Sequence, residues 1–181
     1  MATAGLWSCA GNRQSQAPKG TVSIIPMPAN VSEKEDSFLL DKQTVIVATN
    51  ESDKKTAGLF NAWLKELTGY ELAVKDQGNE NAILLQTGSD TTNAEGYTLS
   101  VNHNNITING NSGSGTFYGI QTLIQLLPVQ KAHAMYVPGV EIKDSPRFAY
   151  RGLHLDVGRH FFPVEFIKKY IDLMAMHKFN T

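Results

Sequence analysis

The stretch Asp144-Ser-Pro-Arg-Phe-Ala-Tyr-Arg151-Gly-Leu-His-Leu-Asp156-Val-Gly-Arg159-His160 decides the fold of the carboxyl-terminal part of this chain. Within it, residues 151–157 alternate between polar and apolar types, which is typical of a β-strand. Pro163 then suits the first position of a helix, and apolar residues recur after it at helical spacing. Such a β/α unit cannot close a sheet alone. The apolar stripe is Ile167, Tyr170, Ile171 and Met174, with Glu165 and Lys169 expected to pair on the solvent side.

The composition describes an ordinary globular chain. Its 181 residues are 41% hydrophobic and carry a formal net charge of −1. This length suffices for one full domain with its own core and little more. The near-neutral charge excludes nucleic acid and anionic membrane surfaces as electrostatic partners. No window holds the roughly 18 apolar residues that a membrane span needs.

Residues 21–145 are expected to form a self-contained α+β domain. One helix is predicted between an N-cap at Ser52 or Asp53 and a stop at Gly69, and a second over residues 116–127. The pattern predicts a mixed, largely antiparallel sheet with two helices on one face, followed by the first strand and helix of a truncated (β/α)₈ barrel in residues 146–181. The strands are expected at residues 44–49, 71–74, 82–87, 97–101, 106–109 and 137–142.

The amino terminus carries a motif around the single cysteine. Leu6-Trp7-Ser8-Cys9 resembles the lipobox of bacterial lipoproteins, in which the cysteine becomes lipidated. Residues 1–20 are small and polar, and we expect them to be a disordered leader. Because no apolar signal segment precedes Cys9, the lipobox interpretation requires that the beginning of the signal is missing from this sequence. The alternative is an ordinary cysteine in a flexible terminus.

The glycine-rich segment at residues 110–119 does not match a phosphate-binding motif. No Gly-Lys-Ser/Thr follows it, and Gly119 lies at the wrong offset for a dinucleotide fingerprint. Bulky Phe117 and Tyr118 occupy the first helical turn, where a phosphate needs bare backbone. We therefore expect a tight turn with close helix–sheet packing, and no cofactor.

Candidate functional residues gather in the quoted stretch. His154 and Asp156 share one face of the expected strand, but no third ligand completes a metal site, so an ion cluster of Arg151, Asp156 and Arg159 is favoured. On a barrel strand, Arg151 could point toward the carboxyl-terminal mouth, where ligands bind. Its fork of donors suits two neighbouring sugar hydroxyls. The alternative, which spacing alone favours, is a structural pair with Asp156 or Asp144.

Together these segments resemble the amino-terminal part of a β-N-acetylhexosaminidase of glycoside hydrolase family 20. Residues 144–160, continuing through residues 171–180, resemble the start of the family's catalytic barrel. Residues 96–101 and 115–127 resemble the small α/β domain that precedes that barrel. The resemblance covers residues 21–181.

The resemblance implies a retaining enzyme that removes terminal N-acetylglucosamine or N-acetylgalactosamine from glycans. The substrate's own acetamido oxygen attacks the anomeric carbon, and an adjacent Asp-Glu pair assists. That pair is expected beyond Thr181, so we predict that these 181 residues contain no catalytic residue and are inactive. Arg151 matches the substrate-binding position, while Asp156, Arg159 and His160 are expected to brace the strand end. No metal or cofactor is implied.

The resemblance also bears on location and on rival interpretations. With Cys9 as the lipidation candidate, it implies an exported bacterial protein, periplasmic or a lipoprotein of the outer membrane or cell surface, touching membrane only through its lipid. We expect self-association to cover the apolar stripe. Residues 21–145 could instead be a carbohydrate-binding module or the accessory domain of another glycosidase. A binding module would need solvent-facing aromatics, whereas Phe60, Trp63 and Phe117 are predicted to be core, so a supporting platform is favoured.

Overall fold

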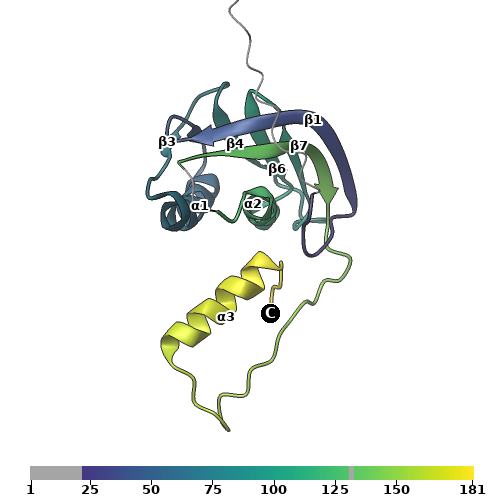
Figure 1. Cartoon of the computed structure of the whole chain (residues 1–181). Helices are drawn as coiled ribbons and strands as arrows, with labels where there is room; N and C mark the ends of the chain where they lie inside the picture. The colour runs from purple at the N-terminus through teal and green to yellow at the C-terminus, as the bar shows by residue number, and fades with distance from the viewer. Residues whose placement is uncertain (1–21, 131–132) are drawn as a thin grey trace, which may run out of the picture.

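The computed structural model describes residues 22–130 and 133–181, which form a seven-stranded sheet covered by helices on one face (Figure 1). Residues 22–145, called here the accessory domain, contain the sheet and helices α1 and α2; residues 146–181, called the β/α unit, contain α3. The elements are β1 (Asn30–Asp41), β2 (Val45–Ala48), α1 (Glu51–Thr68), β3 (Ala73–Lys75), β4 (Ala82–Thr87), β5 (Tyr97–Val101), β6 (Asn105–Gly110), α2 (Gly113–Leu126), β7 (Ala134–Asp144) and α3 (Val164–Met176).

The sheet has the order β1-β7-β5-β6-β4-β2-β3. β1, β7, β5 and β6 pair antiparallel, whereas β6, β4, β2 and β3 pair parallel. α1 supplies the crossover from β2 to β3 in the parallel half, and α2 carries the chain from β6 to β7 on the same face (Figure 1). The predicted mixed sheet with two helices on one face is therefore confirmed.

The core lies between the sheet and the two helices. Alternate residues of the strands are buried there, such as Ile106 and Ile108 of β6, while the helices contribute Phe60, Leu64 and Leu123, all fully buried. Trp63 and Phe117 pack against this cluster from its edge. The prediction that these aromatics belong to the core is confirmed for Phe60, whereas Trp63 and Phe117 are partly buried at its border.

Close backbone packing explains the glycines around the start of α2. A Cβ atom at Gly110 would collide with Thr116, one at Gly115 with the carbonyl of Gly96, and one at Gly119 with Ile108. Ser112 caps the helix by accepting the N–H of Ser114 at 3.2 Å. The segment thus serves helix–sheet packing, as the sequence predicted.

Two helix starts differ from the predicted positions. The N-cap of α1 is Asn50, where Ser52 or Asp53 was expected, because Asn50 and Asp53 bond reciprocally: Asn50 Oδ1 accepts the Asp53 N–H at 2.9 Å, and Asn50 Nδ2 donates to Asp53 Oδ2 at 2.7 Å. α2 begins at Gly113, three residues before the predicted start at 116. The first turn of α2 was not predicted because Gly113 and Gly115 have low helix propensity.

Strand β1 is absent from the sequence prediction. It carries the charged run from Glu33 to Asp36, which reads as a solvated loop. β1 is an edge strand that pairs only with β7, and its register shifts between Glu33 and Ser37. A bulged edge strand tolerates charges because they face water.

The β/α unit forms its helix but no assigned strand over residues 151–157, where one was expected. Its backbone nevertheless begins a parallel pairing: Thr181 N–H donates to Arg151 O at 3.2 Å, and Leu153 N–H donates to Thr181 O at 3.1 Å. Two parallel strands form this pair of hydrogen bonds where a residue of one strand, here Gly152, lies opposite a residue of the other, here Thr181. The expected strand stays irregular because no longer partner strand lies beside it in the described residues.

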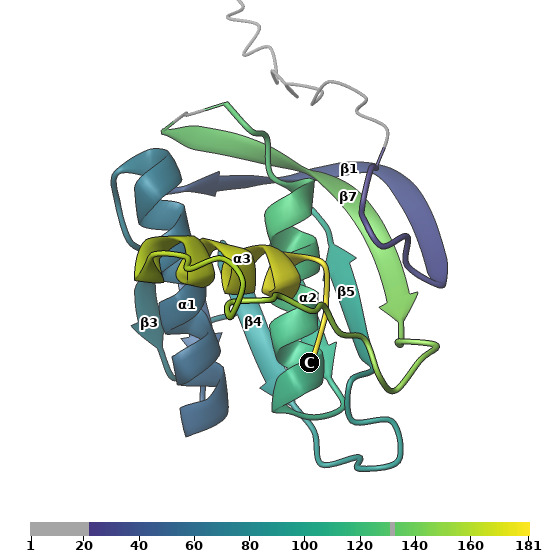
Figure 2. The same cartoon turned by 90° about the horizontal axis from the view of Figure 1, so that it is seen from below.

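Helix α3 lies across α1 and α2, on the side of the helix layer away from the sheet (Figure 2). None of its residues is buried, and Phe166, Ile171 and Leu173 are exposed. The ion pair on its surface joins Glu165 to Lys168 at 3.7 Å; the sequence prediction of Lys169 as the partner was wrong. No helix within the described ranges is long and apolar enough to cross a membrane.

Candidate functional site

Arg151 lies where the β/α unit meets the accessory domain, and it forms a bidentate ion pair with Glu95. Its Nη1 and Nη2 atoms lie 2.9 Å from Oε2 and 2.8 Å from Oε1 of Glu95. The side chains are 15% and 26% exposed, so the pair is largely shielded from water. Two parallel charge-assisted hydrogen bonds make this the strong form of an arginine–carboxylate contact.

The remaining donors of Arg151 are also occupied. Nε donates to the carbonyl of Lys178 at 2.7 Å, Nη1 to the carbonyl of Phe148 at 2.6 Å, and Nη2 to the Tyr118 hydroxyl at 3.0 Å. Together these contacts use all five N–H groups of a guanidinium. The sequence favoured Asp144 or Asp156 as the structural partner; the partner is Glu95. In this arrangement no donor of Arg151 is left for a sugar hydroxyl.

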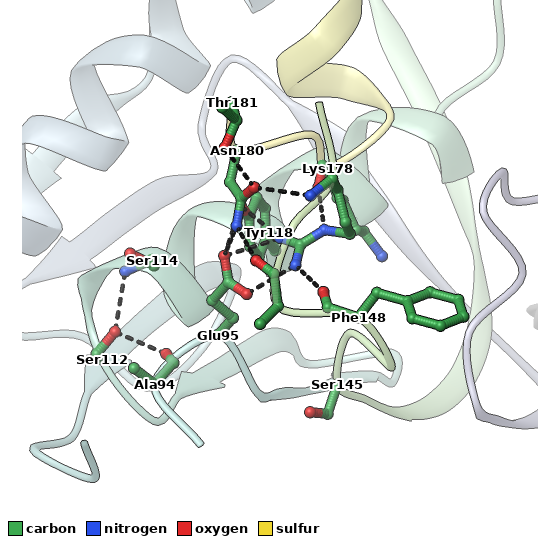
Figure 3. A network of polar contacts seen from close by, with 12 residues as sticks. Ala94, Glu95, Ser112, Ser114, Tyr118, Ser145, Phe148, Lys178, Asn180 and Thr181 are labelled. Atoms are coloured by element: carbon green, nitrogen blue, oxygen red, sulfur yellow. Dashed lines mark hydrogen bonds and ion pairs between the residues drawn. The ribbon is translucent and has the colours of Figure 1, made fainter. Parts of the chain in front are cut away.

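The pKa shifts at this first site, which consists of Arg151, Glu95 and Tyr118, favour the charged ion pair. The hydrogen bond from Arg151 holds the pKa of the Glu95 carboxyl below its usual range, and Glu95 in turn raises the pKa of Arg151. Burial raises the pKa of Tyr118, so its hydroxyl keeps its proton and donates to Glu95 Oε1 at 3.0 Å. Figure 3 shows Glu95, Tyr118 and Asn180 converging here; Asn180 Nδ2 lies 3.3 Å from Glu95 Oε1.

A second charged site lies nearby around Lys178, immediately after α3. The Lys178 side chain is 3% exposed, and its Nζ donates to Asp144 Oδ2 at 2.9 Å and to the Tyr97 hydroxyl at 2.7 Å. Tyr97 Oη also lies 2.6 Å from Thr122 Oγ1 and 3.0 Å from Asp144 Oδ2. Two hydrogen bonds to groups of the accessory domain thus hold this buried ammonium.

Burial and pairing act in opposite directions at this second site. Burial lowers the pKa of Lys178, and the bond to Asp144 only partly opposes that effect. Burial alone would raise the pKa of Asp144, but the hydrogen bond and charge of Lys178 hold it below the usual range. Burial raises the pKa of Tyr97 strongly, so Tyr97 stays neutral. The stable state is a charged Lys178–Asp144 pair with Tyr97 as a neutral bridge.

The direction of the chain separates the two ends of the β/α unit. Arg151 and Lys178 lie against the accessory domain, whereas the chain runs away from it to the turn before α3 and then returns (Figure 1). Arg151 therefore lies at the amino end of the expected strand, and residues 156–160 lie at its carboxyl end. In (β/α)₈ barrels, ligands bind at the carboxyl ends of the strands. This position differs from the expected one at the mouth, and sugar binding by Arg151 stays a prediction.

The other three predicted residues lie together at the far end. Asp156 Oδ1 accepts the backbone N–H groups of Gly158 and Arg159, both at 3.0 Å, and its Oδ2 lies 3.3 Å from Arg159 Nη1. The Arg159 side chain is 93% exposed, and the rings of His160 and Phe162 pack edge to face with their centroids 4.7 Å apart. The single cluster of Arg151, Asp156 and Arg159 that the sequence favoured does not form, because Arg151 pairs with Glu95. Cys9 lies outside the described residues.

Four important residues were not predicted as members of a site: Glu95, Tyr97, Tyr118 and Lys178. Each lies in or beside a segment that was singled out, with Glu95 immediately before residues 96–101. For Glu95 and Lys178 the available signal was a charged residue at the edge of an apolar element, and for Tyr97 and Tyr118 it was a hydroxyl within one; neither signal identifies a partner. Only the fold brings Glu95 to Arg151, 56 residues apart in sequence.

A sugar platform would need aromatic residues around a hollow of the accessory domain, and a metal site would need clustered ligands among the described residues. No group of three or more His, Cys, Asp or Glu side chains that could hold a metal is present there. A hollow of about 800 Å³ lies at the carboxyl ends of β2 and β4, and no aromatic residue is among those that line it. Asp53, the buried carboxylate beside it, is already bonded to Asn50 and Thr87. This hollow therefore does not favour the carbohydrate-binding alternative.

Comparison with known families agrees with this architecture. Residues 21–145 match the model described as glycosyl hydrolase family 20, domain 2. Residues 148–181 match the model of the glycosyl hydrolase family 20 catalytic domain. The chain belongs to glycosyl hydrolase family 20, which confirms the resemblance seen in the sequence.

Among its relatives is a β-hexosaminidase of Porphyromonas gingivalis, 43% identical over 93% of this chain and 23% of the relative. A β-hexosaminidase of Vibrio furnissii is 36% identical over 89% of this chain and 26% of the relative. A mutant Streptomyces plicatus β-hexosaminidase, solved in complex with product (GlcNAc), superposes with a TM-score of 0.81 at 33% identity, over 92% of this chain and 35% of that one. This chain thus spans about a quarter of the length of these curated relatives.

Proposed function

We propose that this chain is the amino-terminal part of a retaining exo-β-N-acetylhexosaminidase that removes terminal N-acetylglucosamine or N-acetylgalactosamine from glycans. The observation that carries the proposal is the order of the two family 20 segments, domain 2 over residues 21–145 followed by the start of the catalytic domain over residues 148–181. Relatives that match across this junction are named β-hexosaminidases. One solved relative holds its product, GlcNAc.

The proposed mechanism is substrate-assisted. The acetamido oxygen of the sugar attacks the anomeric carbon, and an Asp-Glu pair stabilises the acetamido group, protonates the leaving oxygen and then activates water. The 181 residues contain no Asp-Glu dipeptide. We therefore expect no glycosidase turnover from these residues alone.

The residue that we assign to the substrate side is Arg159. It lies at the carboxyl end of the expected strand, its side chain is 93% exposed, and Asp156 contacts only one end of its guanidinium at 3.3 Å. The remaining donors match sugar hydroxyls. Arg151, whose donors are all engaged by the protein, is assigned to the junction between the domains.

Two experiments on a nitrophenyl N-acetyl-β-glucosaminide test this proposal. The 181-residue chain alone should show no turnover. A chimera in which it replaces the matching segment of the Porphyromonas gingivalis relative should hydrolyse the substrate. The matched control is the nitrophenyl β-glucoside, which lacks the acetamido oxygen and should not react. Turnover by the 181 residues alone, or a folded chimera equally active on both substrates, contradicts the proposal.

We also propose that the protein is exported and lipidated at Cys9, on the support of the Leu6-Trp7-Ser8-Cys9 motif. Expression of the full gene in a bacterium fed an alkyne-labelled fatty acid should label the protein. A Cys9→Ser variant should lose the label and move to the soluble periplasmic fraction. Equal labelling of both proteins contradicts lipidation at Cys9.

Self-association of the 181-residue chain remains our proposal. Phe148, Phe161 and Val164 of the β/α unit are 60%, 86% and 64% exposed. Exposed apolar surface of this kind favours association in water. Sedimentation velocity across a hundredfold concentration range should show a rising sedimentation coefficient, and a constant monomer value would contradict the proposal.

A further inference from the structure

We propose that the accessory domain carries a two-site docking surface for the catalytic domain, and that Arg151 and Lys178 are positioning residues that hold both ends of the first β/α unit on it. This inference rests on the proposed function, because it assigns a role to the accessory domain within that enzyme. The first site is Glu95 with Tyr118, and the second is Asp144 with Tyr97.

Each site is assembled by the accessory domain itself. Tyr118 of α2 donates to Glu95 within the accessory domain at 3.0 Å. Tyr97 and Asp144 are register partners on β5 and β7, and the Tyr97 hydroxyl reaches Asp144 Oδ2 at 3.0 Å. Both sites therefore have the same design: a carboxylate whose position is fixed by a buried tyrosine hydroxyl. Such a pair accepts one cationic side chain.

The two cations bracket the β/α unit. Arg151 begins the expected strand, and Lys178 follows α3. They are also joined directly, because Arg151 Nε donates to the Lys178 carbonyl at 2.7 Å. The unit thus presents a guanidinium and an ammonium on one surface, spaced to reach both carboxylates.

The two docked ends of the β/α unit, at Arg151 and Lys178, lie beside the residues whose backbones begin to pair as parallel strands. Thr181 N–H donates to Arg151 O at 3.2 Å, Asn180 N–H to the same oxygen at 2.9 Å, and Leu153 N–H to Thr181 O at 3.1 Å. Fixing Arg151 and Lys178 therefore fixes the register between the two strand starts. The accessory domain holds the amino-terminal face of the barrel, opposite to the ligand-binding face.

The clearest test is amide hydrogen exchange of the 181-residue chain, followed residue by residue with NMR. In the Glu95→Gln variant, the amides of Leu153, Asn180 and Thr181 should exchange at least tenfold faster. The amides of β5 and β6 should keep their rates. Glu141→Gln is the matched control, because Glu141 makes a surface pair with Lys34 and its side chain is 61% exposed.

A double-mutant cycle separates docking from general damage. Glu95→Gln combined with Arg151→Met should accelerate exchange at Leu153 by less than the product of the two single effects, because both changes remove the same contact. If Glu95→Gln leaves the three amides protected, or accelerates β5 and β6 by the same factor, the docking proposal is overturned. If the two effects are fully independent in the double variant, the specific pairing is overturned.

Turnover in the chimera reports separately on the proposed function. Fast exchange in Glu95→Gln with an inactive parent chimera would leave the docking surface standing and remove the hexosaminidase assignment. An active parent chimera with unchanged exchange in Glu95→Gln would support the hexosaminidase assignment and overturn the docking surface. Within an active chimera, Arg151→Lys should retain more turnover than Arg151→Met, since a lysine keeps one charge contact with Glu95.

Discussion

Lys178 Nζ lies 2.9 Å from Asp144 Oδ2 and 2.7 Å from the Tyr97 hydroxyl, with only 3% of the lysine side chain exposed. A charge buried this deeply is stable only while its partner is present. The contact also joins residues from the last strand of the sheet and from the end of α3. It therefore links the stability of the β/α unit to that of the accessory domain.

Replacing Lys178 by methionine should lower the free energy of unfolding by roughly 3 kcal/mol, the lower end for breaking a buried ion pair. The loss is limited because the Tyr97 hydroxyl and the Ala29 N–H still donate to Asp144. Urea denaturation measures it. Lys168→Met is the control: Lys168 is 67% exposed and pairs with Glu165 at 3.7 Å, so its loss should cost under about 1 kcal/mol. Equal losses in both variants would contradict the assigned role.

Acid should release the β/α unit from the accessory domain. Glu95 and Asp144 both have pKa values below their ordinary ones. A carboxyl with a lowered folded-state pKa contributes stability above its unfolded pKa of about 4, and that stability is lost as pH falls through the folded value. We therefore expect the exchange rate of the Leu153 amide, corrected for its intrinsic pH dependence, to rise below about pH 4.

The groups around these carboxyls define the control for the acid experiment. Glu95 faces Arg151, Tyr118 and Asn180, none of which titrates near pH 4, and Asp144 faces Lys178 and Tyr97. A variant carrying both Glu95→Gln and Asp144→Asn should show fast exchange with no acid transition of its own. A transition that persists unchanged in that variant would assign the acid sensitivity to other carboxyls.

The glycines of the two accessory helices should respond oppositely to alanine. At Gly119 a Cβ would collide with Ile108 Cγ2 and lie 3.3 Å from Tyr97 Cδ2, so Gly119→Ala should cost about 1–3 kcal/mol. At Gly58 nothing lies within 4 Å of the added carbon, so Gly58→Ala should stabilise α1 by about 0.5–1 kcal/mol. Thermal unfolding of both variants measures these effects. The melting temperature should fall for Gly119→Ala because of the close packing, and it should rise for Gly58→Ala because alanine favours the helix.

The cap of α1 supports a buried carboxylate as well as the helix. Asn50→Ala removes both the acceptor for the Asp53 N–H and the Nδ2 donor to Asp53 Oδ2. We expect a loss of about 1–2 kcal/mol. Asn50→Ser keeps the capping oxygen and should lose less than the alanine variant in the same denaturation experiment. A serine variant as unstable as the alanine variant would show that the amide donor dominates.

In the active chimera, Arg159→Met should lower kcat/KM by about ten- to a hundredfold, the worth of a charged hydrogen bond to substrate. Because the Arg159 side chain is 93% exposed, stability should change little. Arg151→Met should lower turnover only through the loss of docking, so its loss should come with lower stability and faster exchange at Leu153. A loss of activity confined to Arg151→Met would return the substrate-binding role to Arg151.

The sequence predicted the architecture well because hydrophobic periodicity is a local property. The apolar run that begins residues 82–87 and the alternation in residues 97–101 predicted β4 and β5, and Gly69 correctly ended α1 in a left-handed conformation with φ of 83°. β1 escaped prediction since its charged face is set by an edge position in the sheet. An edge position is a tertiary property that no local pattern encodes.

The candidate site was predicted less well, for a related reason. Arg151 and Asp144 were both noted, but their partners Glu95 and Lys178 come from 56 and 34 residues away. Local spacing suggested that Arg151 would pair within its own segment. A sequence pattern gives the chemical type of a side chain, whereas the partner depends on which elements the fold brings together.

The Tyr118–Glu95 and Tyr97–Asp144 contacts have a consequence for biosynthesis. All four residues precede Arg151 in the chain, so they leave the ribosome before the cations that they bind. Domains generally fold as units during synthesis, the amino-terminal one first. The accessory domain would then present two prepared anionic sockets to the emerging chain, serving as a template on which the nascent barrel begins to fold.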